Sequence, residues 1–315
     1  MCTRVVYSGK NGMVATGRSM DWKTEMHSNL WVFPKGIERN GETGANSLKW
    51  TSKYGSVVTS AFEIASTDGM NEKGLVANLL WLPETEYPVR DQSKPGLAIT
   101  AWVQYMLDNF ATVDEAVAFI DENTFQVVSD LMPDGSRLAT LHLSISDATG
   151  DCAIFEYTGG KLTVYHSKEY KVMTNSPTYN KQLALNEYWK SIGGLSFLPG
   201  TNRPSDRFAR ASFYINALPQ TDDVRIAIAS VFSVIRNTSV PYGISEFPEI
   251  STTQWRTVSD SKNLLYFFES SLTPNTFWVN LRETDLSEGA PVLKLSIANG
   301  ETYHGNATKE FKPAQ

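Results

Sequence analysis

A cysteine directly after the initiator methionine is the residue best suited to covalent chemistry in this chain. If Met1 is removed, Cys2 carries a thiol beside a free α-amino group. The pKa of an α-amino group is about 7.7–8.0, so a useful fraction is a neutral base near neutral pH. An N-terminal amine that activates a side-chain nucleophile is one route to acyl transfer. Many chains carry cysteine at position 2 without catalytic use, so the assignment of Cys2 as a nucleophile depends on other residues.

Two charged residues follow a hairpin that would return them to Cys2. Residues 2–7 and 13–17 are β-rich, and the Asn-Gly pair at 11–12 is a hairpin signal. Arg18 and Asp21 come directly afterwards. Asp21 can orient the α-ammonium group, and the fixed charge of Arg18 can stabilise a thiolate. By itself, such a pair also fits a surface salt bridge of little energetic value.

Asn175 and Arg207 offer the remaining polar groups that acyl transfer requires. Asn175 ends a predicted strand, where its side-chain amide can donate to an oxyanion, although a turn asparagine fits the same position. Arg207 and Arg210 lie three residues apart in a predicted helix and share one face. The same spacing is also found for charged residues that are exposed to solvent and have no catalytic role.

The elements that must position these residues alternate between strands and helices. Besides 2–7 and 13–17, strands are predicted at 56–62, 75–82, 138–146, 152–157, 161–165, 171–174, 254–259, 264–269 and 277–281. Helices are predicted at 97–110, from Thr112 with Glu115 as a capping box, at 179–192, at 205–217, and at 222–236 opened by Thr221. This order predicts an α+β layered fold with antiparallel sheets. No linker divides it, so we expect one domain over residues 1–315.

The composition excludes several classes of partner. The 28 basic and 34 acidic residues give a net charge of −6 without a basic cluster, which argues against nucleic acid. The longest apolar runs are too short to cross a membrane. No dinucleotide or P-loop motif is present, and four scattered histidines lack zinc-ligand spacing, so we expect no zinc site. Cys152 lies in an apolar run and is predicted to be buried. The absence of a signal-peptide pattern favours the cytoplasm, or the periplasm if a leader was trimmed.

Taken together, Cys2, Arg18, Asp21, Asn175 and Arg207 resemble the choloylglycine hydrolase family, which contains bile salt hydrolases and penicillin V acylases. The resemblance covers nearly the whole chain. Its strongest local matches are the Met1-Cys2-Thr3 start and the segments at 17–22, 68–75, 173–177 and 205–213.

This resemblance implies an N-terminal-nucleophile hydrolase with a four-layer αββα sandwich, two antiparallel sheets between helix layers. It implies autocatalytic maturation to a free Cys2, no cofactor or metal, and a bacterial homotetramer. Cys2 would be nucleophile and base, with Arg18 and Asp21 positioning it and Asn175 donating to the oxyanion. Arg207 is preferred to Arg210 because it matches the first arginine of the family's Ser-x-Arg-Phe-type stretch.

One departure from the family pattern concerns position 81. Gram-positive bile salt hydrolases carry asparagine there, whereas this chain carries Trp81, which resembles the Gram-negative penicillin V acylases. The backbone N–H at this position can still serve as a second oxyanion donor. Trp22 and Trp81 would line a pocket for a flat phenoxy or phenyl group, or else belong to the core.

The expected activity is therefore amide hydrolysis of a small molecule, first of penicillin V. Conjugated bile salts and N-acyl homoserine lactones are the alternative substrates, and a catalytically silent binding protein is the alternative outside enzymes. Segments 22–31, 60–68 and 131–138 are expected to set the preference.

Overall fold

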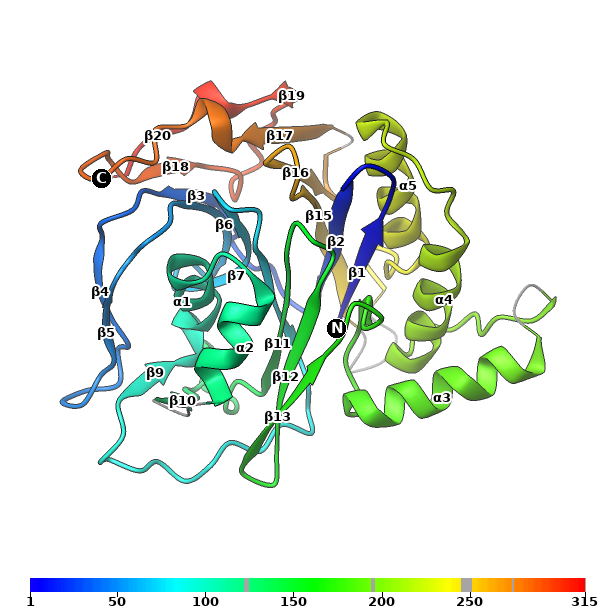
Figure 1. Cartoon of the computed structure of the whole chain (residues 1–315), viewed down its shortest axis with the longest axis horizontal. Helices are drawn as coiled ribbons and strands as arrows, with labels where there is room; N and C mark the ends of the chain where they lie inside the picture. Colours follow the sequence, from blue (N-terminus) through cyan, green and yellow to red (C-terminus); the bar gives the residue numbers. More distant parts are fainter. Residues whose placement is uncertain (122–124, 194–195, 245–250, 274, 315) are drawn as a thin grey trace.

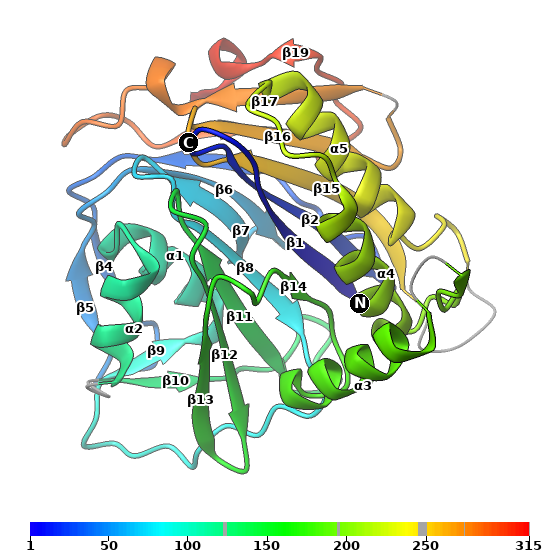
Figure 2. The same ribbon diagram turned by 45° about the vertical axis from the view of Figure 1, so that its right-hand side comes forward.

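Two large β-sheets face each other between two layers of helices, as Figure 1 and Figure 2 show. The computed structural model describes residues 1–121, 125–193, 196–244, 251–273 and 275–314. Helix α1 (Trp102–Asn109) packs on one sheet, whereas α4 (Pro204–Ala217) and α5 (Val224–Asn237) pack on the other. The predicted αββα sandwich is confirmed.

The first sheet carries the N-terminus. Its strands, in spatial order, are β14 (Val172–Met173), β1 (Cys2–Ser8), β2 (Val14–Trp22), β15 (Thr252–Asp260), β16 (Leu265–Ser270), β17 (Thr276–Asn280) and β19 (Gly305–Asn306). Neighbours pair antiparallel except β17 and β19, which are parallel. Four of these strands therefore come from the C-terminal part of the chain, beside the N-terminal hairpin.

The second sheet is antiparallel throughout its described pairings. Its strands, in order, are β13 (Lys161–His166), β12 (Cys152–Thr158), β11 (Leu141–Ser146), β8 (Val76–Trp81), β7 (Ala65–Asn71), β6 (Ser56–Ala61), β3 (Leu30–Phe33), β18 (Leu293–Leu295) and β20 (Lys312–Pro313).

Shorter elements complete the molecule. They are the strands β4 (Glu38–Asn40), β5 (Lys49–Thr51), β9 (Gly96–Ala98) and β10 (Gln126–Val128), the 3-10 helices η1 (Ile99–Ala101), η3 (Leu281–Glu283) and η4 (Thr308–Glu310), and the helices α2 (Val113–Asp121) and α3 (Tyr179–Ile192). No described helix is long and apolar enough to span a bilayer.

The β1–β2 hairpin forms as the sequence predicts. Asn11 and Gly12 have φ values of 51° and 73°, the left-handed conformation that a tight turn needs and that asparagine and glycine adopt readily. The register places Cys2 opposite Met20 and Arg4 opposite Arg18. Both strands are almost wholly buried, because β1 and β2 lie between the second sheet and the helices α4 and α5.

Two predicted helix starts are wrong. The segment 97–110 begins as strand β9, pairs in parallel with β10, and becomes α-helical only at Trp102. An apolar run of this kind suits a buried strand as well as a buried helix. Helix α5 is capped by Asp223, whose side chain accepts from the N–H groups of Arg225 and Ile226, rather than opened by Thr221. The Thr112 cap holds, since its hydroxyl accepts from Glu115 N at 3.2 Å.

The apolar core is divided by the second sheet. One cluster fills the space between the sheets and under α4 and α5, and the other lies between the second sheet and α1 and α2. Cys152 is buried as predicted. Cys2 belongs to the first cluster, so the candidate nucleophile lies inside the sandwich.

Candidate active site

Cys2 is buried at the start of β1 and faces a positive charge. Arg18 Nη2 lies 3.6 Å from Cys2 Sγ and also donates to the carbonyl of Leu79 at 3.0 Å. The Arg18 side chain is fully buried, with its guanidinium 4.7 Å from the ring centre of Trp255. The strand register and these contacts hold one cation against the sulfur, which stabilises negative charge there.

Asp68 is a residue to which sequence reasoning assigned no role. Its Oδ2 lies 3.6 Å from Arg18 Nη1, and both side chains are fully buried. The same carboxylate accepts from Asn78 at 2.7 Å and from the Tyr266 hydroxyl at 2.5 Å. Burial raises the pKa of Asp68, and the Arg18 charge opposes that rise. Asp68 therefore balances and orients Arg18.

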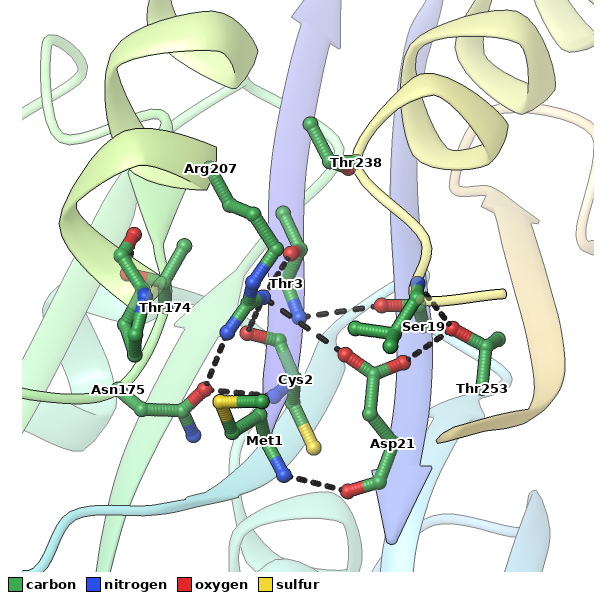
Figure 3. A network of polar contacts seen from close by, with 12 residues as sticks. Met1, Cys2, Thr3, Ser19, Asp21, Thr174, Asn175, Arg207, Thr238 and Thr253 are labelled. Atoms are coloured by element: carbon green, nitrogen blue, oxygen red, sulfur yellow. Dashed lines mark hydrogen bonds and ion pairs between the residues drawn. The ribbon is translucent and has the colours of Figure 1, made fainter. Parts of the chain in front are cut away.

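Asp21 lies on β2 with its carboxylate directed toward Cys2 and Arg207 (Figure 3). Oδ1 accepts from Thr253 Oγ1 at 2.6 Å, and Oδ2 lies 3.7 Å from Arg207 Nη1. The register of β15 shifts between Thr253 and Trp255, opposite Asp21 and Met20, and such irregularities re-aim side chains. Among the described residues, Oδ2 accepts no hydrogen bond, so it is free to receive a new donor.

Arg207 reaches the site from α4, with its side chain fully buried. Nη1 donates to the carbonyl of Cys2 at 2.7 Å and to Thr3 Oγ1 at 2.5 Å. Burial lowers the pKa of Arg207, and the Asp21 charge opposes that change. Arg210 instead donates to the carbonyls of Pro199 and Thr201, away from Cys2. The geometry thus brings Arg207, and not Arg210, to the candidate nucleophile.

Asn175 follows β14 and contacts Cys2 directly. Its Oδ1 accepts from the backbone N–H of Cys2 at 2.6 Å and from Arg207 Nη2 at 2.9 Å. Because a guanidinium only donates, these contacts fix which amide atom is oxygen. Nδ2 then points to the carbonyl of Trp81, at 2.6 Å. That bond uses one of the two Nδ2 hydrogens and leaves the other for a ligand.

The backbone of Trp81 points into the same space. Leu82 N–H donates to Thr140 O at 2.9 Å, and neighbouring residues of a strand direct their N–H groups to opposite sides. The N–H of Trp81 therefore points away from β11, toward the side where the carbonyls of Leu79 and Trp81 accept from Arg18 and Asn175. Pairing between β7 and β8 stops at Asn78, so this side of position 81 is open to the site.

The amine of Met1, which precedes Cys2, lies in this cluster (Figure 3). The amine donates to the backbone carbonyl of Asp21 at 2.5 Å. Burial lowers the pKa of this amine from its ordinary value. With Met1 present, the nitrogen of Cys2 is a peptide nitrogen and cannot act as a base.

An apolar pocket opens on the other side of the sulfur. Trp22 and Trp81 have ring centres 5.2 Å apart with their planes tilted by 56°. The pocket wall includes residues of all three segments expected to set substrate preference, among them Met26, Phe62 and Met132. The Arg137 guanidinium lies 4.3 Å from the Trp81 ring centre, so this ring is covered by a cation on one side.

Residues 2–295 match the family described as linear amide C–N hydrolases, choloylglycine hydrolase family. The chain belongs to this family. It is 49% identical over 340 residues to a penicillin V acylase of Pectobacterium atrosepticum, across all of this chain and 90% of the relative. It is 24% identical over 270 residues to a bile salt hydrolase/transferase of Bifidobacterium longum subsp. longum, across 78% of this chain and 84% of that one.

Two solved structures share the fold of this chain. The structure of penicillin V acylase from Agrobacterium tumefaciens superposes with a TM-score of 0.94 at 57% identity, covering 100% of this chain and 98% of that one. A C2A mutant of conjugated bile acid hydrolase from Clostridium perfringens gives 0.81 at 23% identity, covering 97% and 98%, and supports the fold alone.

One group of potential metal ligands occurs among the described residues of this family member. His166 Nε2 lies 2.8 Å from Asp151 Oδ2 and 3.5 Å from Asp114 Oδ1. These residues come from β13, the β11–β12 turn and the first turn of α2, and none lines the Cys2 pocket. A histidine–carboxylate contact accounts for this group, which lies outside the Cys2 pocket.

Proposed function

We propose that this chain hydrolyses the side-chain amide of phenoxymethylpenicillin after removal of Met1. The proposal rests on one observation: the sulfur of Cys2 lies between a polar cluster and an apolar pocket. A buried polar cluster of Arg18, Asp21, Asn175 and Arg207 adjoins Cys2, and an apolar pocket with the Trp22–Trp81 pair opens beside it. The similarity to penicillin V acylases supports the same substrate class.

The proposed reaction begins at the thiolate of Cys2, which attacks the amide carbon. The Asn175 Nδ2 hydrogen that remains and the N–H of Trp81 donate to the oxyanion. The freed amine of Cys2 gives a proton to the departing nitrogen, the C–N bond breaks, and a thioester forms. Water then attacks the thioester with the amine as base, which releases the acid and the thiol.

The roles of the charged residues follow from their contacts. Arg18 stabilises the thiolate. Asp21 Oδ2, which lacks a hydrogen bond in the described structure while Met1 is present, receives the ammonium form of the Cys2 amine. Arg207 holds the Cys2 carbonyl, the Asn175 amide and the Asp21 carboxylate together.

The Trp22–Trp81 pair favours a flat aromatic acyl group. Aromatic rings interact favourably with tilted or edge-on partners at separations of about 4.5–7 Å. The phenoxy ring would lie among Trp22, Met26 and Phe62, while the carboxylated leaving group stays at the mouth near Arg137.

We further propose a homotetramer assembled in part through α3. This helix projects from the body of the molecule in Figure 1. Leu185, Tyr188 and Ile192 of α3, and Phe197 beyond it, are apolar and 41–58% exposed. Light scattering after size-exclusion chromatography should give four times the chain mass. Tyr188→Glu should shift that mass downward, and a monomeric wild-type protein would refute the assembly.

The first test is the intact mass of the purified protein with and without iodoacetamide. A mass lacking methionine, with one fast-reacting thiol, is the expected result. Retained Met1 with an unreactive Cys2 would contradict a mature nucleophile and favour a silent homologue.

The second test compares three substrates at equal concentration. Phenoxymethylpenicillin, glycodeoxycholate and a long-chain N-acyl homoserine lactone are each incubated with the processed protein, and kcat/KM is measured. Penicillin V should give the highest value. A higher kcat/KM for glycodeoxycholate or for the lactone would overturn the substrate assignment while leaving the amidohydrolase family unchanged.

A further inference from the structure

Behind Asn175 lies a buried polar assembly that the reaction as described does not use. His142, Glu156 and Gln182 are each at most 2% exposed, although polar side chains are seldom buried to this degree. None of them lines the apolar pocket or contacts Cys2 in the described structure. All three are instead directed at the segment 174–176 or at the helix that follows it.

His142 joins the two candidate oxyanion donors. It lies on β11 opposite Leu80 of β8, one register position from Trp81. Its Nε2 lies 2.9 Å from the carbonyl oxygen of Thr174, and because a carbonyl only accepts, Nε2 must carry the proton. The strand that pairs with Trp81 therefore also holds the residue before Asn175.

Glu156 fixes His142 and the start of α3. His142 Nδ1 lies 2.8 Å from Glu156 Oε1. Tyr179 is the first residue of α3, and its backbone N–H donates to Oε2 of the same carboxylate at 2.9 Å. A carboxylate at a helix N-terminus is favoured by the unpaired N–H groups and by the helix dipole.

Gln182 closes the assembly from the first turn of α3. Its Nε2 donates to Thr174 Oγ1 at 3.2 Å, to Asn175 O at 3.2 Å and to Ser176 O at 2.7 Å. Its Oε1 is buried and accepts no hydrogen bond from any described residue. An unpaired buried carbonyl costs free energy, and the three contacts of Nε2 offset that cost.

We propose that His142, Glu156 and Gln182 are positioning residues that hold Asn175 so that its second Nδ2 hydrogen meets the oxyanion. The proposal rests on the proposed acyl-transfer reaction. The backbone of Asn175 lies outside the sheet ladder, because β14 ends at Met173, so its carbonyl and those of Thr174 and Ser176 are held by side chains instead. Displacement of a catalytic group by about 1 Å can cost on the order of 100-fold in rate.

The test compares His142→Gln with His142→Leu in the processed enzyme. Glutamine places an N–H near the former Nε2 and can still donate to Thr174 O, whereas leucine cannot. His142→Leu should lower kcat for phenoxymethylpenicillin by about 10- to 100-fold with little change in KM, because an oxyanion contact acts only in the transition state. His142→Gln should recover most of that loss.

Two controls separate positioning from general destabilisation. The rate of Cys2 alkylation by iodoacetamide should stay at the wild-type value in both variants, since Arg18 is held by other elements. His166→Asn removes a second histidine–carboxylate pair, between His166 and Asp151, away from the site. It should lower the melting temperature without lowering kcat.

Gln182→Leu provides an independent test if His142→Leu does not fold. It should reproduce the fall in kcat at unchanged alkylation rate, and a wild-type kcat would overturn the proposal. Acylation of the thiol by p-nitrophenyl acetate releases p-nitrophenolate in an initial burst. This burst distinguishes the proposed substrate from the proposed positioning role. A wild-type enzyme that gives this burst but ignores penicillin V refutes the substrate assignment. Variants with a wild-type burst rate refute the positioning role.

Discussion

The two sides of Cys2 are built from different kinds of structure. On the polar side, Arg18 and Asp21 come from β2, Thr253 from β15 and Arg207 from α4, all fully buried. On the apolar side, Trp22 and Trp81 lie on strands, but part of the wall comes from connections between strands, as at Met26, Phe62 and Met132. Regular elements hold side chains more narrowly than connections do, so the part of the acyl pocket built from connections can vary more than the polar side.

The charges of the polar side form two balanced pairs. Arg18 faces Asp68, and Arg207 faces Asp21, with separations of 3.6 and 3.7 Å between fully buried side chains. Removing one member of such a pair leaves an uncompensated buried charge. The apolar side has no comparable dependence, since exchanging one apolar side chain for another changes volume and contact area alone. Substitutions should therefore separate the two sides cleanly.

The largest effect is expected at the sulfur where the two sides meet. Cys2→Ala should reduce hydrolysis of any amide substrate to the background rate, because no described group near position 2 can replace the thiolate. Cys152→Ala is the matched control, since this cysteine is buried on β12 and burial raises its thiol pKa. Cleavage assays on both proteins decide the matter. Residual turnover by Cys2→Ala would place the nucleophile elsewhere.

The next largest effect is expected at Asp21. Asp21→Asn should lower kcat by about 100-fold or more and reduce the free energy of unfolding by about 3–5 kcal/mol, because Arg207 loses its counter-charge. Denaturant unfolding and steady-state kinetics measure the two effects. Glu269→Gln removes a carboxylate from the exposed Arg236 and the partly buried Arg256, and it should leave kcat unchanged. Equal behaviour of the two variants would contradict a special role for the polar side.

On the apolar side, the expected change is in KM. Trp22→Leu should raise KM for phenoxymethylpenicillin by about tenfold with kcat nearly unchanged, as the loss of one aromatic contact implies. Trp278→Leu, on β17 and outside the pocket, is the matched control. A fall in kcat as large as that of Asp21→Asn would mean that the pocket and the polar cluster are not separable.

The elements and residues of the polar side differ in how far the sequence alone predicts them. The β1–β2 hairpin is predictable, because β-rich segments and an Asn-Gly turn act over a few residues. Such local signals cannot show that Arg207 donates to the carbonyl of Cys2, 205 residues earlier. Arg18, Asp21, Asn175 and Arg207 emerged as a group through the family resemblance, and the structure brings all four to Cys2.

Other features depend on contacts that no local pattern encodes. Asp68 lies in the segment 68–75 that resembles the family, but its ion pair with Arg18 exists only when the two sheets face each other. The register shift beside Thr253 aims a hydroxyl at Asp21 and has no sequence signature. The strand start of the 97–110 segment depends on pairing with β10, which lies almost thirty residues further on.

The smallest effect is expected where the pocket meets solvent. Arg137 is exposed and its guanidinium covers the Trp81 ring at 4.3 Å, an interaction worth about 0.5–1 kcal/mol at such sites. Under the proposed function, the carboxylate of a bound penicillin lies on the solvent side of Trp81, near this cation. Arg137→Ala should therefore raise KM for phenoxymethylpenicillin by about two- to fivefold.

A neutral anilide of phenoxyacetic acid should show no change in KM, because it offers the same ring but no carboxylate. Arg225→Ala, at an exposed arginine of α5, controls for the loss of surface charge. An equal rise in KM for both substrates would instead assign Arg137 to the orientation of Trp81, and so to the aromatic pair.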